Sequence, residues 1–198
     1  MFTPAEGSPA PSVFLGGDVV IDTADPDVVA LATQIRSRSE SDVDYARQAY
    51  EWVRDEVTHS VDAVDPRVTL TAGEVLRARR GLCFAKSHLY AALLRRQGVP
   101  AALCYQRLRD GDGGFVLHGI VAVHLEGEWH RQDPRGNRPG MEAEFSLGAE
   151  KLVWTADGAS GEIDYPSLYS RPVDVVVAAL ESTEDALQLC ATGLPSEI

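Results

Sequence analysis

The sequence predicts an α+β protein in which helices come first and an antiparallel sheet follows. Apolar residues recur at helical spacing over residues 25–57 and again over 83–97. Stretches with strand character then follow between residues 101 and 133, and a two-residue turn joins the last two of them. Helices and strands that are segregated along the chain in this way are typical of α+β folds.

Composition limits the class of protein. The chain has 198 residues, of which 44% are apolar and 24% charged, as in an ordinary globular protein. This length predicts a single domain over residues 1–198. Acidic residues exceed basic ones by 30 to 18, which gives a net charge of −12. An acidic chain with dispersed basic residues is a poor match for nucleic acid or for an anionic membrane, so neither is expected as a partner.

Targeting and metal-binding patterns are absent from the sequence. No apolar run approaches the roughly 18 residues of a membrane span, and the first residues lack the pattern of a signal peptide. The three cysteines form no CxxC pair, and no HExxH motif occurs, so neither a disulfide framework nor a metal or other cofactor is expected. We therefore expect reduced thiols and a cytoplasmic location.

The N-terminal third is expected to be flexible at first and then helical. Residues 1–12 are rich in Pro, Ala, Ser and Gly, which predicts mobility. A short strand is expected at 13–21, interrupted by two glycines. Asp25 before a proline predicts a helix start, with Asp as the cap and Pro in the first turn. A second helix is expected over residues 41–57.

Capping signals define the next two helices. Residues 71–74, Thr-Ala-Gly-Glu, have the form of a capping box and predict a short helix. Another helix is expected from Cys83 to Gln97, because Gly98 stands where a helix C-cap is expected and Pro100 prevents continuation.

The sheet is expected to contain three strands, at 101–108, 116–125 and 128–133. Asp110 to Gly114 predicts the first turn, and Glu126-Gly127 predicts a hairpin loop of two residues. Residues 134–171 are predicted to form loops. Residues 172–192 are predicted to be helical, with a new helix beginning near Ser182.

Cys83 is the first candidate for chemistry. It opens a helix directly after Gly81 and Leu82, where free backbone N–H groups and the helix dipole favour a thiolate. The bland alternative is that Cys83 is a small buried apolar residue, the usual state of a cysteine. Cys104 and Cys190 have no neighbouring feature that would favour a thiolate, so both are expected to be structural residues.

A cysteine nucleophile needs a base, and strand parity selects His118. If Glu126-Gly127 is the loop, paired residues have numbers that sum to an odd value, so His118 and Asp133 point to the same face. His130 points to the other face, and His124 lies about 13 Å along the strand from Asp133. The alternative is that His118 is a buried strand histidine and Asp133 caps the turn before Pro134.

The sequence resembles the transglutaminase-like superfamily, which has a papain-like fold, over about residues 40–137. The stretches that carry the resemblance are Thr71–Leu76, Gly81-Leu82-Cys83 with its helix, Gln97-Gly98-Val99-Pro100-Ala101, His118–Val123, and Glu128-Trp129 leading to Asp133-Pro134. The resemblance implies a core of helices packed on an antiparallel sheet, with the nucleophile at a helix N-terminus. It implies Cys83 as nucleophile, His118 as base and Asp133 as the residue that orients it. On this reading 40–137 is the core, and residues 138–198 are an extension, loop-rich and then helical.

The family includes cross-linking enzymes, cysteine proteases, peptide N-glycanases and inactive members. Two departures from its pattern concern the substrate class. Phe84-Ala85-Lys86 replaces the usual acidic or aromatic residues after the cysteine, and Gly119 stands where many members carry an aromatic residue. A weaker resemblance is to arylamine N-acetyltransferases, through Arg80–Phe84, although the glutamate that follows Cys-Phe there is absent. A catalytically inactive binding module on the same fold is the third alternative.

The expected chemistry is transfer or hydrolysis of an amide acyl group from a protein or peptide. The backbone N–H of Cys83 is a natural donor to the oxyanion, and His59 and Gln106 are candidates for the second donor. Arg135 follows Asp133 closely and could favour an acidic group of the substrate. The alternative for Arg135 is a solvated basic turn.

Overall fold

The computed structural model describes residues 2–111 and 113–198. Met1, in the segment predicted to be flexible, and Asp112, in the predicted turn, lie outside the described residues. The helices are η1 (Pro11–Leu15), α1 (Pro26–Arg36), α2 (Asp42–Glu56), α3 (Ala72–Ala78), α4 (Cys83–Arg96), η2 (Gly158–Ser160), α5 (Asp174–Glu181), α6 (Ala186–Gln188) and the π-helical turn η3 (Leu189–Gly193). The strands are β1 (Thr58–His59), β2 (Arg80–Gly81), β3 (Ala101–Arg109), β4 (Phe115–Leu125), β5 (Glu128–Gln132) and β6 (Ile163–Asp164).

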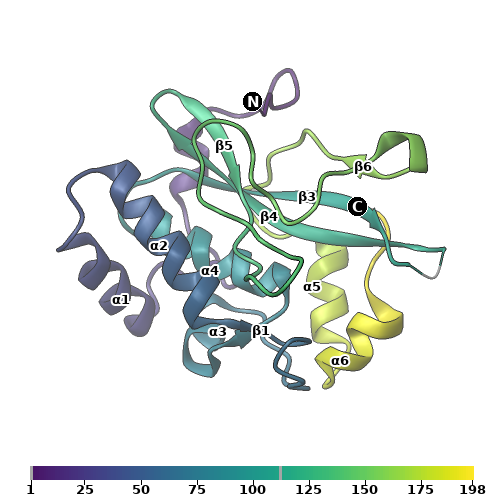
Figure 1. Cartoon of the computed structure of the whole chain (residues 1–198). Coiled ribbons are helices and arrows are strands. Elements are labelled where there is room, and N and C mark those ends of the chain that lie inside the picture. The colour runs from purple at the N-terminus through teal and green to yellow at the C-terminus, as the bar shows by residue number, and fades with distance from the viewer. Residues whose placement is uncertain (1, 112) are drawn as a thin grey trace.

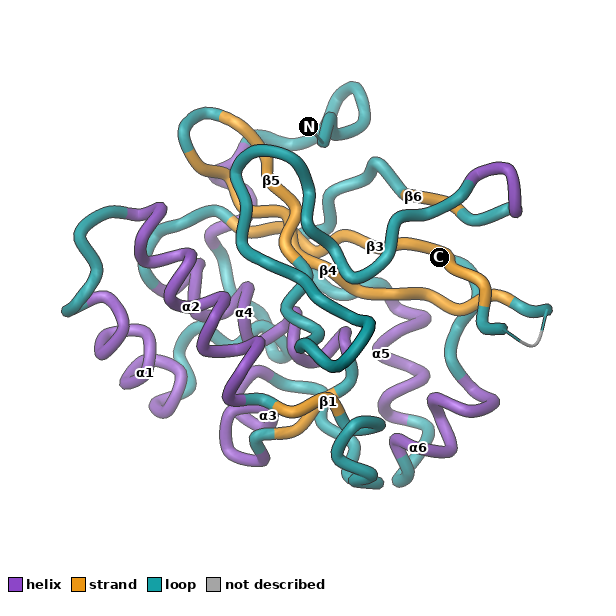
Figure 2. The backbone as a smooth tube through the Cα atoms, in the orientation of Figure 1, coloured by secondary structure: helices purple, strands orange, loops and turns teal. Residues whose placement is uncertain are grey.

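The fold is α+β, as the sequence predicts. The main sheet has the strand order β5-β4-β3-β6 and is antiparallel throughout. Figure 1 shows helices α1 to α6 gathered below this sheet, and Figure 2 shows a long loop passing in front of β4 in this view. The larger hydrophobic core lies on the helix side, and a smaller one around Phe14, Ile120 and Trp129 lies on the other.

The predicted helix starts are confirmed. The Asp25 carboxylate accepts hydrogen bonds from the backbone N–H groups of Asp27 and Val28 at the start of α1. The Ser41 side chain caps α2 in the same way. Thr71 and Glu74 form the complete capping box of α3. These short side chains satisfy N–H groups that have no partner within the helix.

Helix α4 is the centre of the molecule. Its residues from Cys83 to Arg95 are all buried, and it packs against α1, α2, α3, β3 and β4. A helix that is covered on every side can carry small apolar residues all around, and this explains its weak amphipathic pattern. Helix α4 therefore presents Cys83 from a rigid position.

The β4–β5 hairpin has the predicted register. Leu125 pairs with Glu128, and Val121 pairs with Gln132. Glu126 and Gly127 both have positive φ, at 53° and 86°, as a two-residue hairpin turn of type I′ requires.

One predicted element is wrong, and three short strands were not predicted. Residues 13–21 contain no strand. Pro11 begins the 3₁₀ helix η1, and the Asp18 side chain turns the chain by accepting hydrogen bonds from Val20 and Ile21. Strands β1, β2 and β6 have two residues each, too few to show any periodicity.

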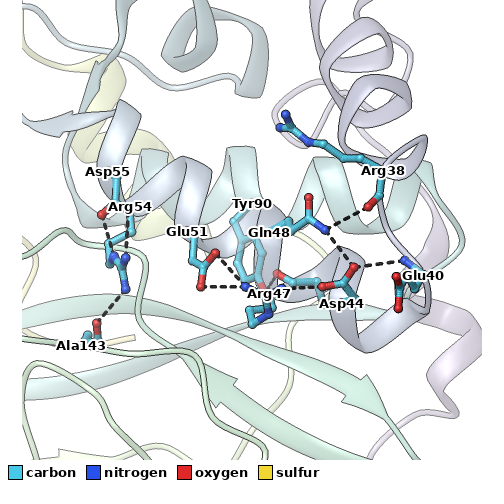
Figure 3. Close-up of polar contacts among 11 residues, drawn as sticks. Arg38, Glu40, Asp44, Arg47, Gln48, Glu51, Arg54, Asp55, Tyr90 and Ala143 are labelled. Carbon is cyan, nitrogen blue, oxygen red and sulfur yellow. Dashed lines mark hydrogen bonds and ion pairs between the residues drawn. The ribbon is translucent and has the colours of Figure 1, made fainter.

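The outer face of α2 carries a polar network (Figure 3). Arg47 lies between Asp44 and Glu51, which are one turn away on either side. Arg54 pairs with Asp55 and also reaches the backbone oxygen of Ala143, at 3.4 Å. Exposed ion pairs of this kind contribute little to stability, so the network adds little to the free energy of folding.

The C-terminal segment packs on the helix side of the sheet. Val176, Leu180 and Leu189 are part of the larger core. The backbone N–H of Leu117 in β4 donates to the Pro195 oxygen at 2.7 Å. Residues 173–197 therefore border the strand that carries His118. Among residues 2–111 and 113–198, no helix is long and apolar enough to cross a bilayer.

Candidate active site

Cys83 opens helix α4 directly after strand β2. Its N-cap residue, Leu82, provides no side-chain cap, so the first backbone N–H groups of α4 keep their capacity to bind an anion. Gly81 lies in close packing here, because an added Cβ would stand 3.2 Å from both the Ala85 Cβ and the Thr69 Oγ1. The chain therefore enters the helix in a fixed position, with the thiol at the positive end of the dipole.

His118 and Asp133 lie together on the hairpin. The His118 Nε2 is 2.8 Å from the Asp133 Oδ2. Asp133 has no exposed surface, and its carboxylate also accepts the backbone N–H groups of Arg135 at 3.1 Å and Val153 at 3.2 Å. These donors hold the carboxylate in one orientation, and the carboxylate in turn holds the imidazole.

The second nitrogen of His118 faces Cys83. The Cys83 side chain lies close enough to His118 for the two groups to interact, and since Nε2 is already bound to Asp133, Nδ1 is the nitrogen that remains for the thiol. Burial alone would lower the pKa of His118, but interaction with Asp133 and Cys83 raises that pKa to about 10. Burial would raise the pKa of Asp133, but the charge of His118 and the hydrogen bonds from His118, Arg135 and Val153 together lower that pKa.

Gly119 lets strand β4 approach helix α4. A Cβ at this position would lie 2.7 Å from the Phe84 Cδ1 and 3.3 Å from the Phe84 Cα. The Ser87 hydroxyl donates to the Gly119 oxygen at 3.1 Å and fixes the contact. His118, next along the strand, is thereby kept within reach of Cys83.

Trp154 and Gln106 support the imidazole from behind. The Trp154 ring meets the His118 ring edge-on, with centroids 4.7 Å apart. Gln106 pairs with His118 across strands β3 and β4, and its Nε2 donates to the Trp154 oxygen at 3.4 Å. Gln106 is buried and does not line the cleft beside Cys83.

A cleft of about 360 Å³ opens above these residues. Cys83 and His118 lie in its wall together with His59 and Arg135. The remaining wall is mostly apolar, with a few charged groups; it is formed by Val61, Leu108, Arg109, Asp110, Val116, Leu117, Arg138, Met141, Trp154, Thr155, Glu162, Cys190 and Leu194. An apolar cleft with few polar groups is the usual form of a substrate site.

Arg135 is not part of a solvated basic turn, and that expectation is wrong. Only 4% of it is exposed, and its guanidinium binds both oxygens of Asp62, at 2.7 and 3.1 Å. Arg138 binds the same carboxylate at 2.9 Å and remains partly exposed. Asp62 offered no sequence signal because its role depends on the turn after β1, which brings it across to residue 135.

His59 and Lys86 also belong to this region. His59 lies in β1, which pairs with β2 so that His59 is level with Gly81. Burial and the charge of Arg135 lower the pKa of His59 to about 3, so its imidazole is neutral. Lys86 is one turn after Cys83 and has no exposed surface; its ammonium donates to the backbone oxygens of Val57 and Arg54.

The other two thiols differ in position. Cys104 is buried in β3, and burial raises its pKa to about 12. Cys190 lies in the wall of the cleft with Cys83, which the sequence did not indicate. Burial raises the pKa of Cys190 to about 11, so it is a protonated thiol at neutral pH.

Comparison with solved structures finds chains of similar fold. A candidate cysteine protease from Cytophaga hutchinsonii has a TM-score of 0.52 at 18% identity, over 62% of this chain and 40% of that one. The periplasmic domain of TgpA from Pseudomonas aeruginosa has a TM-score of 0.48 at 21% identity, over 64% and 48% of the two chains. A TGase has a TM-score of 0.42 at 16% identity, over 72% and 41%. This chain thus covers less than half the length of each of the three.

Sequence comparison identifies the family. No curated protein matches the chain. The profile of the transglutaminase-like superfamily matches residues 29–134, which is 106 of the 198 residues and slightly more than half of the chain. The matched region runs from within α1 to the residue after Asp133, and so includes Cys83 and His118. The chain belongs to the transglutaminase-like superfamily.

Proposed function

We propose that this protein is a cysteine-dependent enzyme that transfers or hydrolyses the acyl group of an amide in a protein or peptide. One observation carries the proposal: a buried imidazole, His118, shares the wall of one cleft with the Cys83 thiol, interacts with it, and is hydrogen-bonded to the Asp133 carboxylate. This arrangement is that of an activated nucleophile, its base and the group that orients the base.

The roles of the residues follow from the contacts. Cys83 is the nucleophile, and His118 takes its proton to form a thiolate–imidazolium pair. The thiolate attacks the amide carbonyl, and the new C–S bond pushes the carbonyl electrons onto oxygen. When the carbonyl forms again, the C–N bond breaks and protonated His118 donates to the leaving amine. Water or another amine then attacks the thioester, with His118 as base, and releases the acyl group from Cys83.

Asp133 keeps His118 in the reactive form. Because Asp133 binds Nε2, the imidazole presents Nδ1 to the thiol, and the carboxylate stabilises the imidazolium. Arg135 is held by Asp62 and lines the cleft, so we assign it to shaping the substrate site beside Asp133. No cofactor is needed for this chemistry.

Two alternatives make different predictions. An arylamine N-acetyltransferase-like enzyme would take an acetyl group from acetyl-coenzyme A onto Cys83, and intact mass would reveal it as a gain of one acetyl group. An inactive binding module would leave Cys83 unreactive. The proximity of His118 to Cys83 and the cleft above them support the enzyme over the module.

The experiment that tests the proposal is alkylation by iodoacetamide, followed at each cysteine by peptide mass spectrometry from pH 5 to 9. An ordinary thiol with a pKa of about 8.5 is only about 0.3% thiolate at pH 6. We expect Cys83 to react rapidly at pH 6. His118→Gln should slow this alkylation at least about tenfold, because it removes the imidazole that favours the thiolate. The expected factor is modest, since a paired thiolate is also somewhat less nucleophilic than a free one.

The chain supplies its own controls. Cys104 and Cys190 should react slowly at pH 6 in every variant, because burial keeps both protonated. His124→Gln changes a histidine of the same hairpin that meets the Trp129 ring edge-on and lies outside the cleft, and it should leave the Cys83 rate unchanged. A native protein in which Cys83 reacts no faster than Cys104 and Cys190 would contradict the proposal.

A further inference from the structure

His59 is fixed beside the nucleophile by the backbone. Strands β1 and β2 run parallel, with Thr58 opposite Arg80 and His59 opposite Gly81. The Thr58 N–H donates to the Arg79 oxygen, and the Ser60 N–H donates to the Gly81 oxygen, both at 3.2 Å. These bonds fix the residues on either side of His59 to the segment just before Cys83, and both His59 and Cys83 line the cleft.

One ring nitrogen of His59 is accessible in that cleft. Only 7% of the residue is exposed, and its Nδ1 is buried without a hydrogen-bond partner. Nε2 is neither bonded nor fully buried, so it is the ring nitrogen that is accessible in the cleft. A buried N–H without a partner is rarer than a buried acceptor without one, so the proton belongs on Nε2. The accessible atom is then an N–H donor.

The charge state of His59 makes it a donor and a poor base. The charged or titratable groups near His59 are Arg135, Asp62, Lys86 and His118. Burial and the charge of Arg135 dominate, and they lower the pKa of His59 to about 3. A neutral imidazole with one N–H can stabilise a developing negative charge without giving up its proton, as neutral histidine electrophiles do in other enzymes.

We propose that His59 is the second donor of the oxyanion hole, acting with the backbone N–H of Cys83. This inference rests on the proposed acyl transfer. When the Cys83 thiolate adds to the carbonyl carbon, the carbonyl electron pair moves onto oxygen, which accepts hydrogen bonds from the two N–H groups. When the intermediate collapses, the electron pair returns and the leaving group departs with the proton from His118. His59 is thus a catalytic residue that binds charge and transfers no proton.

The test compares two reactions at the same sulfur. Iodoacetamide is attacked at a saturated carbon, where no oxyanion forms, whereas p-nitrophenyl acetate is attacked at a carbonyl, where one does. His59→Phe keeps the ring and removes the donor, and His59→Gln restores an N–H donor. Loss of one oxyanion donor costs about 10²–10³ in rate in other enzymes. We expect His59→Phe to slow acylation of Cys83 about a hundredfold with alkylation changed less than about twofold, and His59→Gln to recover part of the acylation rate.

The control variant is His130→Phe. His130 is also a buried histidine with one unpartnered ring nitrogen, but it lies outside the cleft, so neither rate should change. The ratio of the two rates corrects for any unfolded fraction, and His59→Leu replaces His59→Phe should that variant not fold. The shape of the pH profile of acylation should also stay the same, since a neutral His59 does not titrate between pH 5 and 9.

The outcomes separate this inference from the proposal beneath it. If wild-type Cys83 shows no enhanced alkylation, the proposed function fails. If alkylation is enhanced and His59→Phe acylates at the wild-type rate, or loses both rates equally, His59 is not an oxyanion donor. A wild-type Cys83 that alkylates rapidly and resists acylation also overturns the inference, because it shows that no oxyanion hole assists attack on an activated ester.

Discussion

Lys86 buries a whole ammonium group one helical turn after Cys83. Its hydrogen-bond partners are the backbone oxygens of Val57 and Arg54, at the C-terminal end of α2. Carbonyl groups at a helix end carry partial negative charge, which compensates part of the loss of hydration. Burial and the charge of Arg135 nevertheless lower the pKa of Lys86 to about 7. Lys86 therefore connects α2 to α4, and the free-energy cost of burying its charge depends on pH.

The pH dependence of Lys86 has a definite sign. Between pH 7 and about 10.5 the unfolded chain keeps the lysine proton and the folded chain does not, so raising the pH favours the folded state. We expect the free energy of unfolding of wild type, relative to Lys86→Met, to rise by on the order of 4 kcal/mol across this range. Urea titrations at pH 6.5 and 10 measure it. Lys151→Met changes an exposed lysine and should show no such trend.

His118 produces the opposite trend. Its pKa is raised to about 10 in the folded protein, so the stability it contributes is fully present below about pH 6.5 and is lost as the pH rises towards 10. The two residues therefore offset one another in wild type. The offset disappears in Lys86→Met, in which stability should fall over this range, and a flat curve in that variant would contradict the pKa shift of His118.

At the residue scale, the sequence indicated the three positions whose residue type the proposed chemistry requires. Position at a helix start selected Cys83, and strand parity selected His118 and Asp133; their catalytic roles stay predictions. Asp62 and Cys190 could not be found in this way, because each reaches the cleft only through the path of a loop or of the C-terminal segment. Long-range contacts of that kind leave no local pattern.

At the scale of elements, the hairpin turn contains a residue in an unfavourable conformation. Glu126 has φ 53°, a left-handed value that costs a residue with a side chain about 1 kcal/mol, whereas Asn adopts it readily. We expect Glu126→Asn to raise the free energy of unfolding by about 0.5–1 kcal/mol, measured by urea denaturation. Glu128→Asn, two residues later in the extended β5, should bring no gain. If Glu126→Asn leaves the free energy of unfolding unchanged, the strain at Glu126 is relieved elsewhere in the turn.

Caps and turns explain which elements were predictable. Asp25, Ser41 and the Thr71–Glu74 box act within one turn of the chain, and so does the Glu126-Gly127 loop, so their sequence signals translate directly into structure. Strands β1 and β2 are different, because each exists only through its partner about 20 residues away. The strand expected at 13–21 does not form, because residues 11–15 form the 3₁₀ helix η1 and the Asp18 side chain turns the chain after it.

For the whole molecule, the C-terminal segment is expected to fold as one unit with the rest. Leu180 is 3% exposed in the larger core, which also contains helix α4. We expect Leu180→Ala to lower the free energy of unfolding by about 2–5 kcal/mol and to shift every probe equally. Alkylation of Cys190, in the C-terminal segment, and of buried Cys104, in β3, should share one midpoint in urea. Val175→Ala, at a 40% exposed neighbour, is the matched control and should cost far less.

Separate midpoints for Cys190 and Cys104 would instead mean that residues 173–198 unfold on their own. The prediction of a single domain over residues 1–198 depends on this result.

The contact between Gly119 and Phe84 constrains which sequences can share this site. The phenyl ring occupies the space that a side chain at 119 would need. A relative with an aromatic residue directly after its histidine must therefore carry a smaller residue directly after its cysteine, or move the strand away from the helix and separate base from nucleophile. The two positions are 35 residues apart in the chain, yet a side chain at 119 can be accommodated only after, or together with, a change of Phe84 to a smaller residue.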